Sequence, residues 1–191
     1  MKDRFTLFLD SLLQTEPDLG FIRELIEGGL DPSYVYPTHG NTAMRAIAQD
    51  GNCEILRMFV DAGADINERI NYKSPVDGRE EIGYTPIFYA TDEEVLKEMI
   101  LLGADVNAQA IDGESALMRF SRYGCPVPMI QAILQSGADA SLSDHQGLTA
   151  LDYAERKNKM WLKLDRKHGD AGTRKQLRES KKVLSMLENS E

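Results

Sequence analysis

The chain has 191 residues, enough for one domain or one short array of repeats, and its composition is that of a globular protein. Its net charge of −9 divides into −15 over residues 1–155 and +6 over residues 156–191. No run of roughly 18 apolar residues occurs, which excludes an apolar membrane-spanning helix. The acidic body disfavours nucleic acid and favours basic partners, although an acidic surface also serves solubility alone.

The N-terminal residues are predicted to form an amphipathic helix over 5–13, followed by a second helix over 18–27. Asp10 interrupts the first apolar run and no small-residue cleavage site follows it, so we expect no signal peptide. Cys53 and Cys125 lack the spacing of metal ligands and are expected to be reduced thiols in a cytoplasmic protein.

Two short strings then recur along the chain in a fixed order. The first follows apolar stretches with helical spacing and reads GLDPS from Gly29, GADIN from Gly63, GADVN from Gly103 and GADA from Gly137. The second reads GNTAMRAIA from Gly40, GYTPIFYAT from Gly83, GESALMRFS from Gly113 and GLTALDYAE from Gly147. Its hydroxyl residues lie 43, 30 and 34 residues apart. This indicates a repeat of about 33 residues with one insertion and one deletion.

These strings resemble the ankyrin repeat, whose pattern is G-x-T-P-L-H-x-A-A, then an apolar helix, then G-A-D-V-N. The resemblance covers roughly residues 3–155, with 176–188 as a final helix. It implies an all-α solenoid of stacked helix-turn-helix units with finger-like turns. The expected units of this single domain are a capping repeat at 1–39, repeats at 40–82, 83–112 and 113–146, and a second capping repeat at 147–191. The histidine of the pattern is replaced here by Arg45, Phe88, Met118 and Asp152.

The start and end of each helix pair have their own signals. Hydroxyl side chains should cap the inner helices or bridge neighbouring turns at Thr42, Thr85, Ser115 and Thr149. Glycines should adopt the left-handed conformation after the outer helices at Gly29, Gly63, Gly103 and Gly137.

Three irregularities interrupt the repeat. The link at 68–82 lengthens one finger, with Pro75 and the Asp77-Gly78 pair favouring a turn at its tip; it is either a functional loop or a tolerated insertion. The third repeat lacks the usual linker between its helices. Its acidic run over 92–94 lies at a helix start, where the helix dipole favours it, in preference to a role in partner binding.

The third irregularity is the basic segment 155–175, which contains Trp161, the only tryptophan. Trp161 either contacts a partner or belongs to a C-terminal cap over the end of the stack, which we favour. Residues 176–187 would then form the closing helix.

No motif for phosphate binding, zinc proteolysis, serine hydrolysis or dithiol chemistry occurs, so we expect no enzyme, cofactor or metal site. The resemblance implies instead that fingers and inner helices line a concave, protein-binding face. By position, its residues are Tyr36, His39, Asn41, Arg45, Glu81, Tyr84, Phe88, Tyr89, Ile111, Asp112, Glu114, Arg119, Tyr123, His145, Gln146, Leu148 and Tyr153, with Tyr72 and Lys73 on the long finger and Trp161 as a secondary contact. An alternative for the aromatic members, notably Phe88 and Tyr153, is packing between repeats.

The leading functional expectation is a non-catalytic, monomeric binding module that occupies a partner protein with a basic surface. Small acidic ankyrin proteins of this kind resemble bacterial immunity proteins, which neutralise a toxin that is often a basic nuclease. An alternative is a passive scaffold, or a substrate of an asparagine hydroxylase, because Asn67 and Asn107 hold the position modified in some ankyrin repeats. Nucleic-acid binding through 156–182 is a third alternative, which the acidic body disfavours.

Overall fold

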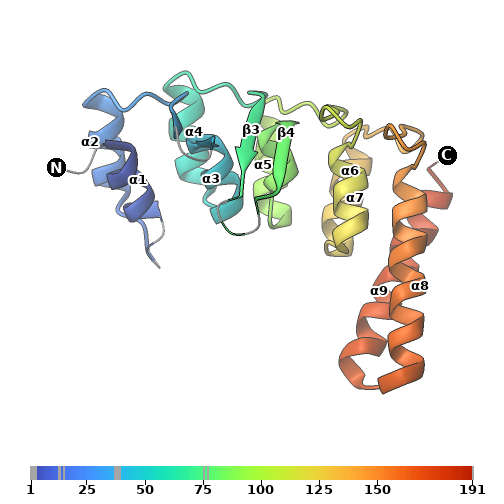
Figure 1. The fold of residues 1–191 in the computed structure, drawn as a ribbon. Coiled ribbons are helices and arrows are strands. Elements are labelled where there is room, and N and C mark those ends of the chain that lie inside the picture. Colours follow the sequence, from blue (N-terminus) through green and yellow to red (C-terminus); the bar gives the residue numbers. More distant parts are fainter. Residues whose placement is uncertain are drawn as a thin grey trace. The chain divides into compact units, whose positions relative to one another are not determined.

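The protein was examined as a computed structural model that describes residues 4–12, 14, 16–36, 40–74, 76 and 78–190, with only the backbone of Tyr36 and His168. It contains two compact units, Met1–Asp105 (unit 1) and Val106–Glu191 (unit 2). Both are built mainly from short helices, which confirms the expected all-α repeat architecture (Figure 1).

Unit 1 stacks its helices in two layers. The inner layer contains α1 (Arg4–Leu12), α3 (Ala43–Asp50) and the 3-10 helix η1 (Pro86–Tyr89). The outer layer contains α2 (Leu19–Glu27), α4 (Cys53–Asp61) and α5 (Glu93–Leu101). Each helix packs against its neighbour in the same layer, and α1 with α2 and α3 with α4 also pack across the layers. No pair could bury its apolar face alone, so stacking supplies the core.

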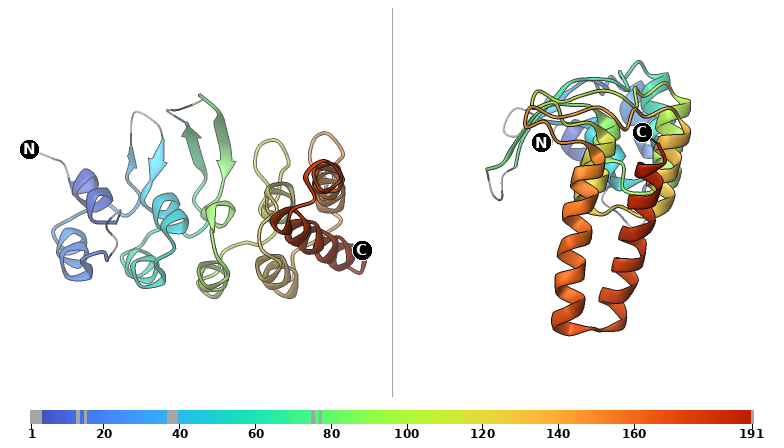
Figure 2. Two further views of the ribbon diagram at one scale, coloured as in Figure 1. Left: turned by 90° about the horizontal axis from the view of Figure 1, so that it is seen from below. Right: turned by 90° about the vertical axis from the view of Figure 1, so that its right-hand side faces the viewer.

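The fingers of unit 1 are two antiparallel hairpins that lie side by side in Figure 2. The first pairs β1 (Val35–Tyr36) with β2 (Asn41–Thr42), and the second pairs β3 (Ile70–Lys73) with β4 (Glu80–Tyr84). The long link therefore contains a β-hairpin. The predicted turn residues Pro75 and Asp77 lie outside the described residues, but the amide of Gly78 donates to the Ser74 carbonyl over 2.9 Å.

The core of unit 1 follows the predicted apolar spacing of the outer helices. Ile55, Leu56 and Phe59 of α4 are fully buried, and the Phe59 ring lies 4.8 Å from that of Phe8 on α1. In α5, Val95, Leu96 and Met99 are buried in the same way, so the 3–4 spacing read from the sequence is confirmed.

The predicted caps are confirmed in three repeats and wrong in the fourth. The hydroxyls of Thr42, Ser115 and Thr149 accept hydrogen bonds from backbone amides three residues later. Thr85 makes no such bond, because the Phe88 amide donates to the Thr85 carbonyl instead and starts a 3-10 helix. The glycines that end the outer helices have the predicted positive φ, for example +98° at Gly63 and +92° at Gly103.

The acidic run of the third repeat has a structural role in its first two members. Asp92 caps α5 by accepting a hydrogen bond from the Val95 amide over 2.9 Å. Glu93 pairs with Lys97 one turn later at 2.5 Å. An acidic cap and an ion pair one turn apart both stabilise the start of a helix. They agree with the prediction that this acidic run has a structural role and does not bind a partner.

Unit 2 continues the two-layer pattern with longer terminal helices. The helix α6 (Ala116–Tyr123) packs against α8 (Ala150–His168), and α7 (Val127–Gln135) packs against α9 (Ala171–Glu188). The helices α8 and α9 also run antiparallel against each other and extend past the ends of α6 and α7 (Figure 2).

The prediction that segment 155–175 interrupts the last repeat is therefore wrong. Residues 155–168 continue α8, and the closing helix begins at Ala171 instead of residue 176. Trp161 is half-buried and lines a small cavity together with Phe120, Ala154 and Val183. These contacts within unit 2 agree with the cap interpretation, while a role of Trp161 in partner binding stays a prediction.

Asparagines link successive turns within each unit. Asn67 accepts a hydrogen bond from the Asp105 amide and donates to the Gly103 carbonyl, at 2.8 and 2.9 Å. Asn107 makes the same two bonds to Asp139 and Gly137, at 2.8 and 3.1 Å. The amide side chain thus satisfies two backbone groups of the next repeat at once.

Replacing Asn107 with alanine should lower the free energy of unfolding of unit 2 by about 1–2 kcal/mol, because two hydrogen bonds are lost at an exposed site that water can enter. Urea unfolding monitored by Trp161 fluorescence reports on this unit. Gln131→Ala, on the exposed side of α7, is the control and should change stability by less than about 0.5 kcal/mol. An equal effect of the two substitutions would contradict the structural role of Asn107.

Candidate binding surfaces

Many of the residues predicted to face a partner are buried within their own unit. They are Arg45, Glu81, Tyr84, Phe88, Tyr89, Glu114 and Tyr153. The alternative of packing between repeats is therefore correct for the aromatic residues among them. Phe88 is only 2% exposed and packs edge-on against Tyr84 at 4.8 Å between ring centroids. His39 lies outside the described residues, as does the side chain of Tyr36.

In unit 1, the predicted residues form a stacked cluster at the base of the long finger. The guanidinium of Arg45 lies 3.6 Å from the ring centroid of Tyr72 and 4.6 Å from that of Tyr89. The Tyr89 hydroxyl donates to Glu81 over 2.8 Å, and Glu81 also pairs with Arg79 at 3.1 Å. Burial raises the pKa of Tyr89 well above its usual range, so the hydroxyl remains a donor at neutral pH. The cluster fixes α3, η1 and the finger relative to one another.

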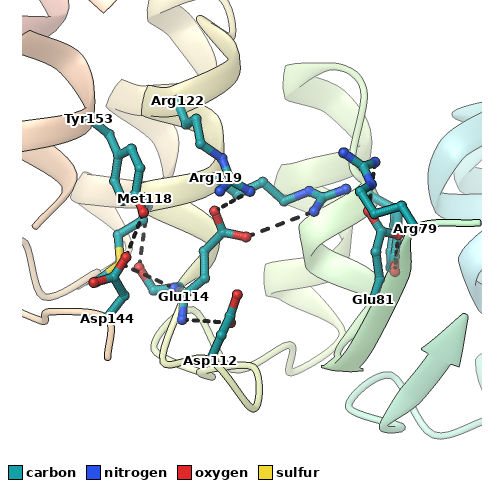
Figure 3. A network of polar contacts seen from close by, with 11 residues as sticks. Arg79, Glu81, Asp112, Glu114, Met118, Arg119, Arg122, Asp144 and Tyr153 are labelled. Carbon is teal, nitrogen blue, oxygen red and sulfur yellow. Dashed lines mark hydrogen bonds and ion pairs between the residues drawn. The ribbon is translucent and has the colours of Figure 1, made fainter. Parts of the chain in front are cut away.

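In unit 2, a buried carboxylate organises the arginines of α6 (Figure 3). Glu114 is 1% exposed, and its carboxylate lies 2.7 Å from Arg122 and 3.9 Å from Arg119. The guanidinium groups of Arg122 and Arg119 lie 5.1 and 5.3 Å from the centroid of the Tyr123 ring. Tyr123 itself is 46% exposed, so the arginines hold an aromatic side chain at the surface.

A second buried carboxylate in unit 2 joins a finger to α8. Asp144 accepts hydrogen bonds from the Tyr153 hydroxyl at 2.5 Å and from the amides of Gln146 and Leu148 at 2.8 and 3.0 Å (Figure 3). Burial raises the pKa of Asp144, but these hydrogen bonds outweigh burial and hold it below its ordinary value. Burial and the same carboxylate raise the pKa of Tyr153 to about 12.

The exposed predicted residues of unit 2 gather at two finger tips, which we call the finger strip: Ile111, Asp112, His145 and Gln146. The two tips touch, because the His145 amide donates to the Asp112 carbonyl over 2.9 Å. Ile111 is 66% exposed there, a large apolar side chain on a tip that also carries Asp112. Leu148 is half-buried.

The α8–α9 hairpin carries half of the Lys and Arg residues of the chain, 11 of 22. Lys163, Arg166 and Lys167 are exposed on α8, and Arg178 and Lys181 are exposed on α9. Among other cations of this hairpin, Lys159 pairs with Glu155 and Arg174 with Asp165. Residues this exposed and this unevenly charged mark a surface that would attract anionic groups.

Sequence reasoning missed several residues of these sites. Arg122 and Asp144 were not proposed, although each binds a residue that was, namely Glu114 and Tyr153. Glu114 lies just before the N-cap of α6 and Arg122 near the end of that helix, so no simple helical spacing relates the two residues. No local signal exists for Asp144 either, because its partner is brought close by the finger turn.

The described residues offer no group of His, Cys, Asp and Glu side chains able to hold a metal ion. Within the same part of the chain, no helix combines the length and the apolar character needed to cross a membrane. Both cysteines are free.

Comparison with known proteins agrees with the geometry. A family model described as the ankyrin repeat matches residues 39–71, which span β2, α3, α4 and the start of β3. This chain is an ankyrin-repeat protein. B-cell lymphoma 3 protein homolog of Mus musculus is similar to it, with 32% identity over 115 residues, which are 59% of this chain and 23% of that protein. The chain thus spans less than a quarter of the length of this relative.

Ankyrin repeats are a non-catalytic module for binding other proteins. In unit 2, the predicted contact residues that remain exposed lie at the touching finger tips and at Tyr123 on α6. In unit 1, Tyr72 of the long finger is stacked on Arg45.

Proposed function

We propose that this ankyrin-repeat protein acts without catalysis, as a monomer that binds a partner with a basic surface and blocks it, as an inhibitor or an immunity protein does. The observation that carries the proposal is the finger strip, where Ile111 is 66% exposed and the next residue, Asp112, accepts a hydrogen bond from the His145 amide. An exposed apolar anchor with charged neighbours is typical of a protein interface. The net charge of −15 over residues 1–155 favours a basic partner.

Tyr123 extends this surface onto the inner helix α6. Its ring is held by Arg119 and Arg122, which Glu114 holds in turn. A tyrosine fixed in this way loses little conformational freedom on binding, which makes it a suitable interface anchor.

The test uses two binding variants and one matched control. Ile111→Ala and Tyr123→Ala should each weaken binding at least tenfold, about 1.4 kcal/mol, since each removes an exposed anchor. Leu101→Ala removes a similar side chain that is 80% exposed on the outer helix α5, and it should leave affinity unchanged within about twofold. The partner is isolated from source lysate on the immobilised protein, identified by mass spectrometry, purified and titrated against all three variants.

Ionic strength supplies a second readout. The association rate should fall as salt rises from 50 to 300 mM, because long-range attraction between opposite charges is screened over about 8–10 Å at physiological salt. An acidic partner, a rate that salt does not change, or equal losses in all three variants would each argue against the proposal.

A further inference from the structure

A groove in unit 1 contains a nearly buried arginine that forms no ion pair with a carboxylate of the described residues. The groove, called here the Arg45 groove, lies between the inner helices α1 and α3 and has a volume of about 300 Å³. It is lined by Leu9, Leu12, Asn41, Arg45, Ala46, Gln49 and Asp50. A volume of this size suffices to receive one or two side chains of a partner.

Arg45 is 9% exposed, and its contacts only partly compensate its charge. The guanidinium is stacked against Tyr72 and Tyr89, at 3.6 and 4.6 Å from their centroids, and its Nη1 donates to Asn41 over 3.2 Å. Its buried Nε has no hydrogen-bond partner among the described residues. Within that same set of residues, no carboxylate forms an ion pair with Arg45. A nearly buried cation that contacts two tyrosine rings, the Tyr89 hydroxyl and one amide, and whose Nε stays unpaired, can still accept a carboxylate partner.

The rest of the groove determines which anion would fit. Leu9 of α1 is half-buried and supplies apolar surface next to the cation, whereas Leu12 is only 1% exposed and backs the groove. Asp50 follows Arg45 by five residues on α3, about 7.5 Å along the helix axis. A small free carboxylate could contact only Arg45. A polypeptide segment could place an acidic side chain on Arg45, an apolar side chain on the apolar wall and a hydrogen-bond donor on Asp50 at the same time.

We propose that the Arg45 groove binds a polypeptide segment of the partner that places an Asp or Glu carboxylate on Arg45 and an apolar side chain against Leu9. Arg45 is already held in place by Tyr72 and Tyr89, so little side-chain entropy is lost when the carboxylate arrives. A charge-assisted pair in this partly dry site is stronger than one on the open surface. The inference rests on the proposed function, because it specifies one contact of the same binding activity.

The test selects a displayed library of random twelve-residue peptides on the immobilised full chain. Peptides retained should share an acidic residue within a few positions of an apolar one, with Lys or Arg enriched about one turn away to meet Asp50. Methyl resonances of Leu9 and Leu12 should shift in NMR spectra when a selected peptide is added, which places it in the groove.

Affinities of a selected peptide and of its Glu→Gln counterpart are then measured on wild type and on Arg45→Met. Loss of the carboxylate should weaken binding to wild type at least tenfold and should have little effect on Arg45→Met. The peptide substitution tests the contact even where the protein substitution disturbs folding, and Arg45→Lys supplies a variant that keeps the charge. N-acetylglutamate amide is the probe for a free carboxylate and should bind at least a hundredfold more weakly than the peptide.

Several outcomes would overturn the inference. They are no enrichment of peptides, enrichment without acidic residues, equal affinity of the Glu and Gln peptides, and binding of N-acetylglutamate amide as tight as that of the peptide. Peptides whose binding depends on Tyr123 or Ile111 but not on Arg45 would leave the proposed function standing and refute this contact alone.

Discussion

Replacing Gly40 with alanine should destabilise the protein by about 3–5 kcal/mol, more than any other single methyl group we consider. Gly40 precedes β2 and has a φ of +66°. A Cβ at this position would lie 1.9 Å from the backbone carbonyl oxygen of Asn71 on β3. Because the obstacle is backbone, no side-chain rotation can relieve it, and one finger would have to move away from the next.

The matched control is Gly147→Ala, at the same position of the last repeat. Gly147 has a φ of +75°, yet an added Cβ there meets no atom within 4 Å. It should cost only the left-handed strain, about 1–2 kcal/mol. Urea unfolding monitored by far-UV circular dichroism measures both variants. If Gly40→Ala is no more destabilising than Gly147→Ala, the close approach of β2 to β3 is not present in solution.

These glycines show which part of the fold could be predicted from the sequence. Helix caps and left-handed glycines depend on a residue and its near neighbours, so Thr42 and Gly63 could be assigned correctly. Thr85 belongs to the same pattern but fails, because deleting residues from its repeat leaves room for only a four-residue 3-10 helix. The loss of the side-chain cap at Thr85 could therefore be recognised only from the structure of the shortened helix.

The start of α8 after Thr149 could be predicted, but its extension beyond residue 155 could not. The basic composition there indicates an interruption of the repeat, although no glycine or proline occurs between Ala150 and His168. Lys, Met, Leu and Arg all favour a helix, and the chain continues helical until Gly169, which adopts a φ of +58°. Charge describes the surface of a helix and does not predict where the helix ends.

For the candidate site, the sequence predicted which segments carry the residues. The sequence placed Tyr89, Glu114 and Tyr153 on inner helices or their starts, which is correct. It left burial of the two tyrosines open as an alternative and gave no sign that Glu114 is buried. Burial depends on partners from distant segments, as when Asp144 receives the Tyr153 hydroxyl. Ile111 and Tyr123 were predicted together with these residues and differ from them in being exposed, at 66% and 46%.

This division has a functional consequence. The buried polar residues hold the fingers and inner helices in position, and the exposed ones form the surface that we propose contacts another protein. Substitutions at Glu114 or Phe88 would therefore alter binding through folding. Substitutions at Ile111 or Tyr123 would alter it with the fold intact, which makes them the informative variants.

Replacing Asp144 with alanine should destabilise unit 2 by about 3–5 kcal/mol at pH 7. The substitution leaves the amides of Gln146 and Leu148 and the buried Tyr153 hydroxyl without their acceptor, and hydrogen bonds to a charged group contribute about 1.5–3 kcal/mol each. Tyr153→Phe removes one of the three bonds and should cost about 1.5–3 kcal/mol. Asp112→Ala removes an exposed carboxylate bonded to one amide and should cost less than about 1 kcal/mol.

The stabilisation that Asp144 provides should decrease as the pH falls. The pKa of Asp144 in the folded protein lies below its ordinary value of 3.8, so the folded state binds its proton less readily than the unfolded state. Its contribution to stability is therefore complete above pH 3.8 and is lost as the pH falls through the folded pKa. Urea unfolding followed by Trp161 fluorescence between pH 7 and pH 3 should show the gap between wild type and Asp144→Ala narrowing below about pH 4. A gap that stays constant, or widens, would mean that Asp144 is not held as a carboxylate by its hydrogen bonds.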